Sequence, residues 1–504
     1  MASLPVDQQN LHLFHNMTIL VTGATGFLAK LFVEKMVRTQ SDFKRMYLLI
    51  RADDISSANK RLLDEVIENE LFRVVGKLGA EGLRSFISEK IVAVPGDIRS
   101  FDLGIIRNDD SNSNIMLHNM FTHIDIIVHS AATVRFDERY DTAINTNLKG
   151  AMNVLSFAQR CTNLKLLLHV STAYVCGEKE GYILEKPFYM GESLNGIDGL
   201  NIETEIRMME DHLSELKVKK ANEKKITLAM KDMGMQRARK YGWPNTYVFT
   251  KAMTEMWLGQ WKGDISLVIM RPTMISSTFK DPFPGWNQGI GTINGFILGY
   301  GKGKMKCLAF DPQSICDLIP SDMVVNAMIC AIIVNMKQMY LRDTIIYHIG
   351  SSMRNPVTYG CLAVSLFKYF TINPWVDKNG KIVKVGKLRS FSTLKAFHAY
   401  MNFYYLIPLK GLKLVNKVTF LSIKGNTHEQ LSRKIKFLIR LVDMYKPYLY
   451  FKSIFKDNNT EELREMVRRM YKIDESTFNF HSSSIDWEEY FMNTHIPAIV
   501  KSLF

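Results

Sequence analysis

Short apolar, β-branched runs alternate with stretches of helical periodicity along the first 350 residues of the chain. After the run at 18–22, apolar positions are spaced as on one face of a helix over residues 30–37. Such alternation is typical of parallel strands joined by helical crossovers. We therefore predict an α/β fold with a doubly wound parallel sheet. The predicted strands are Thr18–Thr22, Met46–Ile50, Ile91–Pro95, Ile124–His129, Lys165–Val170, Leu267–Met270 and Ile345–Ile349.

Two charged helical stretches interrupt this alternation, near residues 55–90 and 202–240. We expect the first to be surface packing. The second either covers a substrate entrance or forms a solvated hairpin. The pattern becomes mainly helical towards the end of the chain, so we predict two domains, residues 1–375 with both insertions and residues 376–504.

A glycine-rich turn joins the first predicted strand to the first helix. Gly23 allows a sharp turn, Gly26 allows the backbone to approach a pyrophosphate, and Ala29 takes the place of a third glycine. The N–H groups at the start of the helix would face the phosphates. This arrangement is typical of a Rossmann-type dinucleotide site, although a glycine-rich turn alone is weak evidence.

Three further strand ends carry groups suited to the same ligand. Arg51 follows the second strand, where a cation suits the 2′-phosphate of NADP(H); the alternative is an ordinary surface arginine. Asp97 follows the third strand, where a carboxylate can meet an adenine amine. Ala131, after the fourth strand, leaves room for a flat ring. Parallel strands place all of these ends at one edge of the sheet.

A phenol and an amine lie one helical turn apart in a later helical stretch. Tyr247 and Lys251 share a helix face, and an ammonium beside a phenol lowers the pKa of the phenol. Such a tyrosine can donate a proton to an oxygen that gains charge during hydride transfer. Ser171 or Thr172, after the fifth strand, would add a hydroxyl. Tyr-x-x-x-Lys also occurs by chance on helix surfaces, and a strand-end hydroxyl can be a simple cap.

These motifs occur in the order found in extended short-chain dehydrogenase/reductases, and more specifically the chain resembles the plant alcohol-forming fatty acyl-CoA reductases over its whole length. The resemblance rests on Gly-Ala-Thr-Gly-Phe-Leu-Ala at 23–29, Tyr-Leu-Leu-Ile-Arg-Ala at 47–52, His-Val-Ser-Thr-Ala-Tyr-Val at 169–175, Tyr-Gly-Trp-Pro-Asn-Thr-Tyr-Val-Phe-Thr-Lys at 241–251, and Asp-Pro-Phe-Pro-Gly-Trp at 281–286.

The resemblance implies a role for each matching residue. Thr172 would be the catalytic hydroxyl, Tyr247 the proton donor, and Lys251 the residue that lowers the pKa of Tyr247 and binds the nicotinamide ribose. Asn147 would support a proton-relay water. The residues implied in holding NADPH are Gly23, Thr25, Gly26, Phe27, Leu28, Arg51, Asp97, Ile98, Ala131, Asn147, Tyr247, Lys251 and Pro272.

The resemblance also implies the reaction and its setting. A long-chain or very-long-chain fatty acyl-CoA would be reduced by two NADPH, through an aldehyde, to a primary alcohol for wax, cutin, suberin or related lipids. The expected location is the cytosolic face of the endoplasmic reticulum membrane, with the cytoplasm or a plastid as alternatives. Other functions remain open: a reductase that stops at the aldehyde, a reductase of another lipid carbonyl, and a lipid-binding scaffold without catalysis.

Charge is concentrated in one segment of the 504 residues. The formal net charge is +14, and residues 378–456 hold 17 Lys/Arg against two acidic residues, which leaves the remainder at −1. Such an excess suits nucleic acid, an anionic membrane surface or an acidic ligand. We see no nucleic-acid recognition motif and expect no such partner.

The six cysteines show no CxxC spacing, so we expect neither a zinc site nor a disulfide framework, and we read Cys176 as a small buried hydrophobe.

The basic segment contains the uncharged, aromatic run 396–409, whose 14 residues are too few to span a bilayer. It can be an interfacial membrane anchor, part of a basic surface for the phosphates of CoA, or an ordinary helical core with a solvated basic face. We expect His398 within it to be a packed histidine, and we expect no spanning helix and no secretory signal.

The loop-rich segment 281–303, with Ile290, Phe296 and Leu298, is our candidate for part of the acyl pocket.

Overall fold

A computed structural model of the protein describes residues 12–73, 79–105, 111–289, 291–336, 343–410, 425–472 and 477–502. A seven-stranded sheet forms its centre, in the order β11-β7-β5-β4-β1-β2-β3, and every neighbouring pair is parallel. The strands are β1 (Thr18–Thr22), β2 (Arg45–Ile50), β3 (Ile91–Pro95), β4 (Ile126–His129), β5 (Leu166–Val170), β7 (Leu267–Pro272) and β11 (Ile345–Ile349). The predicted doubly wound sheet is therefore confirmed.

Four strands differ from the prediction at one end: β2 begins at Arg45 and β5 at Leu166, each one residue from the predicted start, and β4 and β7 differ by two residues for identifiable reasons. β4 begins at Ile126, because the Asp125 carboxylate accepts a hydrogen bond from the Thr18 backbone N–H, 2.8 Å away, at the start of β1. β7 continues through Pro272, because β11 pairs with it as far as Ile349. Pro272 lies beyond the pairing of β7 with β5, which ends at Met270, so its missing N–H removes no bond within that pairing.

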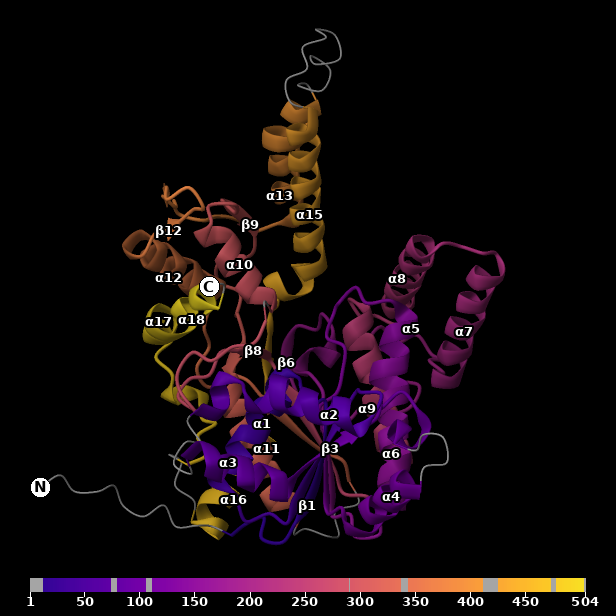
Figure 1. Ribbon diagram of the computed structural model, residues 1–504. Helices are drawn as coiled ribbons and strands as arrows, with labels where there is room; N and C mark the ends of the chain where they lie inside the picture. The colour runs from indigo at the N-terminus through magenta and orange to yellow at the C-terminus, as the bar shows by residue number, and fades with distance from the viewer. Residues whose placement is uncertain are drawn as a thin grey trace, which may run out of the picture.

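Helices cover both faces of the sheet (Figure 1). Successive side chains of β4 point to opposite faces of the sheet. Ile126 and Val128 pack into the core on one face, and Ile127 packs into the core on the other. One face carries α1 (Phe27–Thr39), α11 (Ser321–Asn335) and α16 (Asn458–Tyr471), and the other carries α4 (Ser111–His123), α6 (Gly150–Arg160) and part of α9 (Thr246–Trp261). Every residue of α11 is buried, which explains its apolar sequence.

Both predicted insertions are helical. The first contains α2 (Ile55–Arg61), the π-helical segment η1 (Leu62–Ile67) and α3 (Gly79–Lys90). The second is a hairpin of α7 (Ile202–Val218) and α8 (Glu223–Lys240), beside α5 (Tyr140–Ala143) and the π-helical segment η4 (Ile144–Lys149). The buried Tyr140 hydroxyl anchors the hairpin by donating to Glu205, 2.8 Å away, and Glu205 also accepts from Arg237.

The C-terminal part is mainly helical, as expected, but short strands tie it to the first part. β14 (Arg389–Phe391) pairs with β9 (Cys307–Ala309), and β15 (Ser453–Phe455) pairs with β6 (Gly181–Ile183). The predicted boundary at residue 375 therefore separates two parts that share strand pairs and a hydrophobic core. The remaining elements are the 3-10 turns η3 (Phe101–Gly104), η5 (Ala173–Cys176) and η7 (Ser482–Ser484), β8 (Met274–Ser276), α10 (Thr292–Gly301), β10 (Leu318–Pro320), α12 (Tyr359–Ile372), β12 (Trp375–Val376), β13 (Ile382–Val383), α17 (Trp487–Glu489), the π-helical segment η8 (Tyr490–His495) and α18 (Ile496–Lys501).

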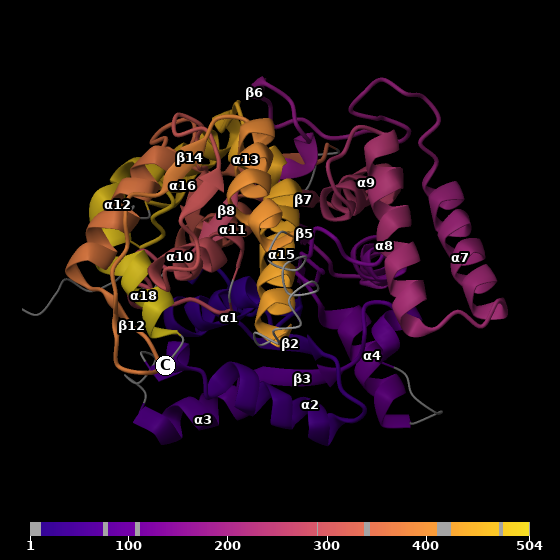
Figure 2. The ribbon, with the colours of Figure 1, turned by 90° about the horizontal axis from the view of Figure 1, so that it is seen from above.

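Two C-terminal helical segments lie side by side as an arm that projects from the body (Figures 1 and 2). The arm consists of residues 394–410, which include α13 (Leu394–Met401) and the π-helical segment η6 (Asn402–Leu406), and of α15 (Gly425–Leu449). His398 joins the two segments through its Nε2, 2.7 Å from the Asp443 carboxylate, and its side chain is half-buried, less enclosed than the packed histidine that was expected. In the part of the chain that the structure describes, no helix is long and apolar enough to cross a bilayer.

Candidate active site

The turn between β1 and α1 leaves no room for side chains at its first glycine. Gly23 has φ +73°, and a Cβ there would lie 2.8 Å from the backbone N of Ala131. Gly26 caps α1 without any side-chain hydrogen bond, so the first N–H groups of the helix have no side-chain cap. A tight backbone cradle at an uncapped helix start is suited to a pyrophosphate. These residues therefore fit the dinucleotide that the motif predicts.

The predicted proton donor, Tyr247, lies at the start of the helix α9. Asn245 caps this helix, because its Oδ1 accepts a hydrogen bond from the Val248 N–H at 3.1 Å. Burial raises the pKa of Tyr247 to about 12, and a hydrogen bond with the Thr172 side chain acts in the opposite direction. The phenol therefore holds its proton at neutral pH, as a proton donor must.

Lys251 lies one turn further along α9 and is also buried. Its Nζ donates to the Val170 carbonyl at 2.8 Å. Burial lowers the pKa of Lys251 to about 8, while the nearby Glu255 carboxylate acts to raise it. The sequence led us to expect that Lys251 lowers the pKa of Tyr247. In this structure the group that lowers it is Thr172, because the ammonium is held at the end of β5.

The pattern at the strand end left Ser171 and Thr172 open as the hydroxyl, while the resemblance implied Thr172, and the structure gives the two residues different partners. Ser171 donates its hydroxyl hydrogen to Glu255, which also binds the Arg271 guanidinium with Nε 3.1 Å from Oε1. Thr172, in contrast, contacts Tyr247. Thr172 is therefore the hydroxyl beside the phenol, and Ser171 is bound to the carboxylate behind it.

Both motifs open into one cavity of about 1570 Å³, including its mouth, which we call the catalytic cavity. The predicted residues that line it are Gly23, Gly26, Phe27, Leu28, Ser171, Thr172, Tyr247, Lys251 and Pro272. Gln288 and Asn294, from the segment 281–303 that was predicted to form part of the acyl pocket, also line this cavity. Phe136 and Tyr448 line it without having been predicted from the sequence. No residue of 202–240 is among the described residues that line it, so the hairpin α7–α8 does not contribute a wall.

The other predicted cofactor residues lie outside the lining of this cavity: Thr25, Arg51, Asp97, Ile98, Ala131 and Asn147. The Ala131 backbone packs against Gly23, which leaves the next residue, Ala132, to face the cavity. Arg51 is exposed beyond the end of β2. The Asp97 carboxylate accepts from Arg99 Nε at 3.0 Å, and this partner lowers the pKa of Asp97 against the effect of burial.

The Asn147 side chain connects the segment after β4 to helix α9 through hydrogen bonds. Its Nδ2 donates to Thr250 Oγ1 at 3.0 Å and to the Thr133 carbonyl at 3.1 Å, and its Oδ1 accepts from the Thr133 N–H. Both amide hydrogens are therefore used within the protein. The expected water-supporting role of Asn147 stays a prediction.

Two buried histidines lie near Lys251, and the sequence analysis did not assign them a role. His129 and His169 are paired on β4 and β5, with ring centroids 5.0 Å apart. Burial, with the nearby Lys251 charge as the second cause, lowers the pKa of His129 to about 3 and also lowers that of His169. Both imidazoles are therefore neutral. Their position at the ends of two apolar strands was the available signal in the sequence.

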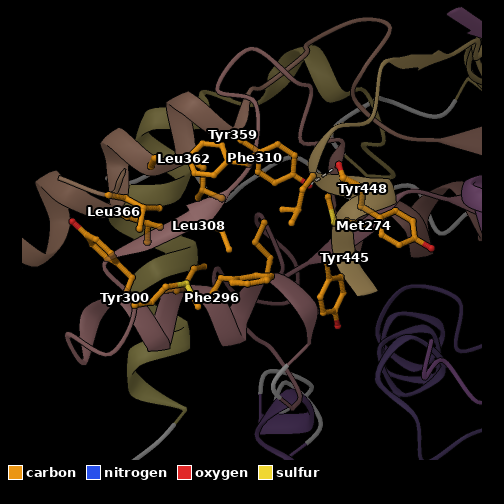
Figure 3. A pocket seen from close by; sticks show the side chains of 16 residues that line it. Met274, Phe296, Tyr300, Leu308, Phe310, Tyr359, Leu362, Leu366, Tyr445 and Tyr448 are labelled. Atoms are coloured by element: carbon orange, nitrogen blue, oxygen red, sulfur yellow. Dashed lines mark hydrogen bonds between the residues drawn. The ribbon is translucent and has the colours of Figure 1, made fainter. Parts of the chain in front are cut away.

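A second, apolar cavity, of about 600 Å³ including its mouth, adjoins the catalytic cavity (Figure 3). The two share Met274, Ile293 and Tyr448. The walls of this apolar cavity come from α10, α12, α15 and the segment around β9, and its lining side chains are hydrophobic or aromatic. Of the predicted acyl-pocket residues, Phe296 lines it, Leu298 is buried without lining it, and Ile290 lies outside the described residues.

All six cysteines are free thiols. Burial raises the pKa of Cys176 to about 12. This thiol is therefore protonated at neutral pH, in agreement with its interpretation as a small buried hydrophobe.

The family comparisons cover both parts of the chain. Residues 21–328 match the NAD-binding family described as male sterility protein, and residues 404–504 match the Sterile family with the same description. An alcohol-forming fatty acyl-CoA reductase of Simmondsia chinensis is 48% identical over 491 residues, 97% of this chain and 98% of that protein. Fatty acyl-CoA reductase 1 of Arabidopsis thaliana is 47% identical over 486 residues, 96% of this chain and 97% of that protein.

Solved structures support the fold. The reductase domain of a nonribosomal peptide synthetase from Mycobacterium tuberculosis has a TM-score of 0.57 at 16% identity, over 99% of this chain and 96% of that one. The terminal R domain of the myxalamid PKS-NRPS pathway also gives 0.57 at 16% identity, over 97% of this chain and 90% of that one. At these identities the likeness establishes the architecture alone.

Proposed function

The chain belongs to the fatty acyl-CoA reductase family, and on this premise we propose that it reduces a long-chain or very-long-chain fatty acyl-CoA to the primary alcohol with NADPH. The observation that carries the proposal is the junction of two cavities. The Tyr247 and Thr172 side chains line a cavity beside a dinucleotide cradle, and that cavity adjoins an apolar one. A thioester carbonyl can therefore lie at the two hydroxyls while its acyl chain is buried in the apolar cavity.

The dinucleotide, when bound, supplies the hydride. The chain's own contribution is to stabilise the charge that develops on the carbonyl oxygen. Hydrogen bonds from Tyr247 and Thr172 to this oxygen, in a site closed to water, would each lower the barrier by about 3–4 kcal/mol. Lys251 keeps two N–H donors beyond the one that it gives to Val170, and these would hold the nicotinamide ribose.

Collapse of the oxyanion breaks the C–S bond, and CoA leaves as a thiolate. A second reduction of the resulting aldehyde gives an alkoxide. Tyr247, with its pKa raised to about 12, still carries its proton at neutral pH and can transfer it to this alkoxide. The two steps therefore use one site twice, with cofactor exchange between them.

The preference for NADPH over NADH rests on the end of β2. Arg51 is exposed there, and Arg61 donates to its backbone carbonyl, so two guanidinium groups lie near this strand end. Guanidinium groups suit the 2′-phosphate that distinguishes NADPH. Gly23, Gly26 and the start of α1 would hold the pyrophosphate, and Pro272 would border the nicotinamide.

The deciding experiment incubates purified protein with acyl-CoA of graded chain length and with NADPH or NADH. Thiol release measures the first step, and chromatography of the products separates aldehyde from alcohol. We expect fatty alcohol, two NADPH oxidised per alcohol, and one CoA released. Accumulation of aldehyde would instead favour the aldehyde-forming alternative. Absence of thiol release at every chain length would exclude the reductase activity.

We also propose that the arm rests on an anionic membrane surface, at the cytosolic face of the endoplasmic reticulum. Four large hydrophobic side chains of the arm are more than half exposed: Phe403 at 66%, Tyr404 at 60%, Ile407 at 57% and Phe437 at 67%. Exposed Lys410, Lys434 and Lys436 accompany them. Aromatic side chains beside lysines suit a lipid interface, where a water-insoluble alcohol can also be released.

Vesicle flotation tests this contact. We expect the protein to float with phosphatidylserine vesicles, and the variant Phe403→Ser/Phe437→Ser to float less. Localisation of a fluorescent fusion distinguishes the endoplasmic reticulum from the cytoplasm and plastids. Equal flotation of the two proteins would exclude the arm as the site of contact.

A further inference from the structure

Tyr448 lies where the two cavities meet, although the sequence places it about 200 residues beyond the catalytic tyrosine. It belongs to the last turn of α15, is 6% exposed, and lines both the catalytic and the apolar cavity. Figure 3 shows Tyr445 and Tyr448 beside Met274 at one end of the apolar cavity, opposite Tyr300 and Leu366. The C-terminal part therefore supplies a residue to the active site itself.

The hydroxyl of Tyr448 is bound to the residue that starts the catalytic helix. Asn245 Nδ2 donates to Tyr448 Oη at 2.8 Å, while Asn245 Oδ1 accepts from the Val248 N–H. Both polar atoms of the Asn245 side chain are therefore hydrogen-bonded, the Nδ2 to Tyr448 and the Oδ1 to the first turn of α9. Because Tyr247 lies in that turn, the position of its hydroxyl depends on the orientation of Asn245.

The ring of Tyr448 makes a second connection to the same site. It packs on Phe136 with centroids 4.9 Å apart, and Phe136 in turn stacks on Tyr247 at 6.0 Å. The Tyr448 ring also meets Tyr174 edge to face at 4.9 Å. Tyr448 is therefore linked to Tyr247 by two routes, one through the Phe136 ring and one through the Asn245 side chain.

We infer that Tyr448 is a positioning residue for the catalytic step: its hydroxyl orients Asn245, and Asn245 sets the start of α9 so that the Tyr247 hydroxyl reaches the substrate oxygen. This inference rests on the proposed function, because it assigns Tyr448 to the same reaction. It also means that the reductase site is incomplete without the C-terminal part. A small displacement of a catalytic group is enough to slow the chemical step.

The test compares Tyr448→Phe with the matched control Tyr450→Phe. The Tyr448→Phe variant would retain the ring contacts and lose only the hydrogen bond to Asn245. The Tyr450 hydroxyl donates to the Phe391 carbonyl at 2.7 Å and lines neither cavity, so its loss removes a comparable bond elsewhere. We expect Tyr448→Phe to lower kcat about 3- to 10-fold, with the KM for acyl-CoA and the Kd for NADPH within twofold of the parent. Tyr450→Phe should leave kcat unchanged.

A double-mutant cycle separates positioning from a general loss of structure. Asn245→Ser keeps an N-cap oxygen for α9 but lacks the longer amide group whose Nδ2 donates to Tyr448. If the two residues act through one hydrogen bond, the double variant is no slower than the slower single variant. Independent, multiplying losses in kcat would overturn the inference, as would a Tyr448→Phe enzyme with parental kcat. Failure of the parent protein itself to reduce acyl-CoA would overturn the proposed function instead, and the parent is assayed alongside for that reason.

Discussion

Glu255 and Arg271 form a buried ion pair directly behind the catalytic side chains, with both side chains at most 3% exposed. Glu255 lies one turn beyond Lys251 on α9, and Arg271 lies next to Pro272 on β7. The same carboxylate accepts the Ser171 hydroxyl. The pair therefore joins the catalytic helix to the edge of the sheet where the cofactor would bind.

Removing one partner of this pair should destabilise the fold strongly. Arg271→Ala leaves the Glu255 carboxylate buried without its cation, and we expect a loss of about 3–5 kcal/mol in the free energy of unfolding. Urea denaturation at pH 7 measures it. The control is Lys368→Ala, which breaks the exposed pair with Glu488, 49% and 61% exposed, and should cost less than about 1 kcal/mol. Similar losses in the two variants would contradict the distinction.

Tyr247→Phe should remove turnover while it preserves cofactor binding. The variant keeps the buried ring and loses the proton donor, so we expect kcat to fall by about 10²- to 10⁴-fold. NADPH fluorescence titration should give a Kd within twofold of the parent. Retention of more than a tenth of the parental kcat would show that another group protonates the alkoxide.

The activity should decline at alkaline pH because Lys251 loses its charge. Its pKa in the folded protein is lowered to about 8, so the ammonium is present below this pH and is lost as the pH rises through it. Tyr247, at about 12, does not titrate in the same range. We expect kcat/KM to fall tenfold per pH unit above about pH 8.

The variant Lys251→Arg is the comparison for the pH dependence of kcat/KM. Arginine stays charged throughout the range, so the slower variant should show no decline up to about pH 10. An identical alkaline limb in both proteins would assign the titration to another group.

Arg51→Ala should reduce discrimination between the two nicotinamide cofactors. Loss of a charged hydrogen bond to the 2′-phosphate should raise the KM for NADPH about 10- to 100-fold and leave the KM for NADH nearly unchanged. Lys60→Ala, an exposed cation on the neighbouring α2, is the control and should change neither value. Equal changes for both cofactors in Arg51→Ala would contradict the assignment to the 2′-phosphate.

Filling the far end of the apolar cavity should shorten the preferred acyl chain. Leu366 lies opposite Met274 in Figure 3, and a larger side chain there takes up space that the end of the chain would occupy. We expect Leu366→Phe to shift the alcohol products towards shorter chains, with turnover of the shortest substrates unchanged. Product profiling over a series of acyl-CoA substrates measures the shift. An unchanged profile would place the acyl chain elsewhere.

The strands and the glycine-rich turn could be predicted because their signals are local. An apolar, β-branched run must be buried, and the sharp turn after β1 needs the positive φ of +73° that Gly23 adopts without a side-chain clash. Tyr247 and Lys251 could be paired because helical spacing places them on one face. The choice of Thr172 over Ser171 was not decided by such signals. Ser171 and Thr172 are neighbours in sequence, and what separates them is their partners. Ser171 binds Glu255 and Thr172 contacts Tyr247, and both partners belong to the distant helix α9.

The sequence by itself determined the doubly wound sheet, the dinucleotide turn and the phenol–amine pair, because each depends on neighbours within one or two elements. Only the tertiary structure showed the contact of Tyr247 with Thr172, the hydroxyl that the resemblance implied, the position of the apolar cavity, and the place of Tyr448 beside the catalytic cavity. These features join segments that lie from tens to hundreds of residues apart, and nothing in the local periodicity records which distant side chains will meet. The physical reason is packing: the arrangement of α9, α12 and α15 around a shared core sets those contacts, and no single segment specifies it.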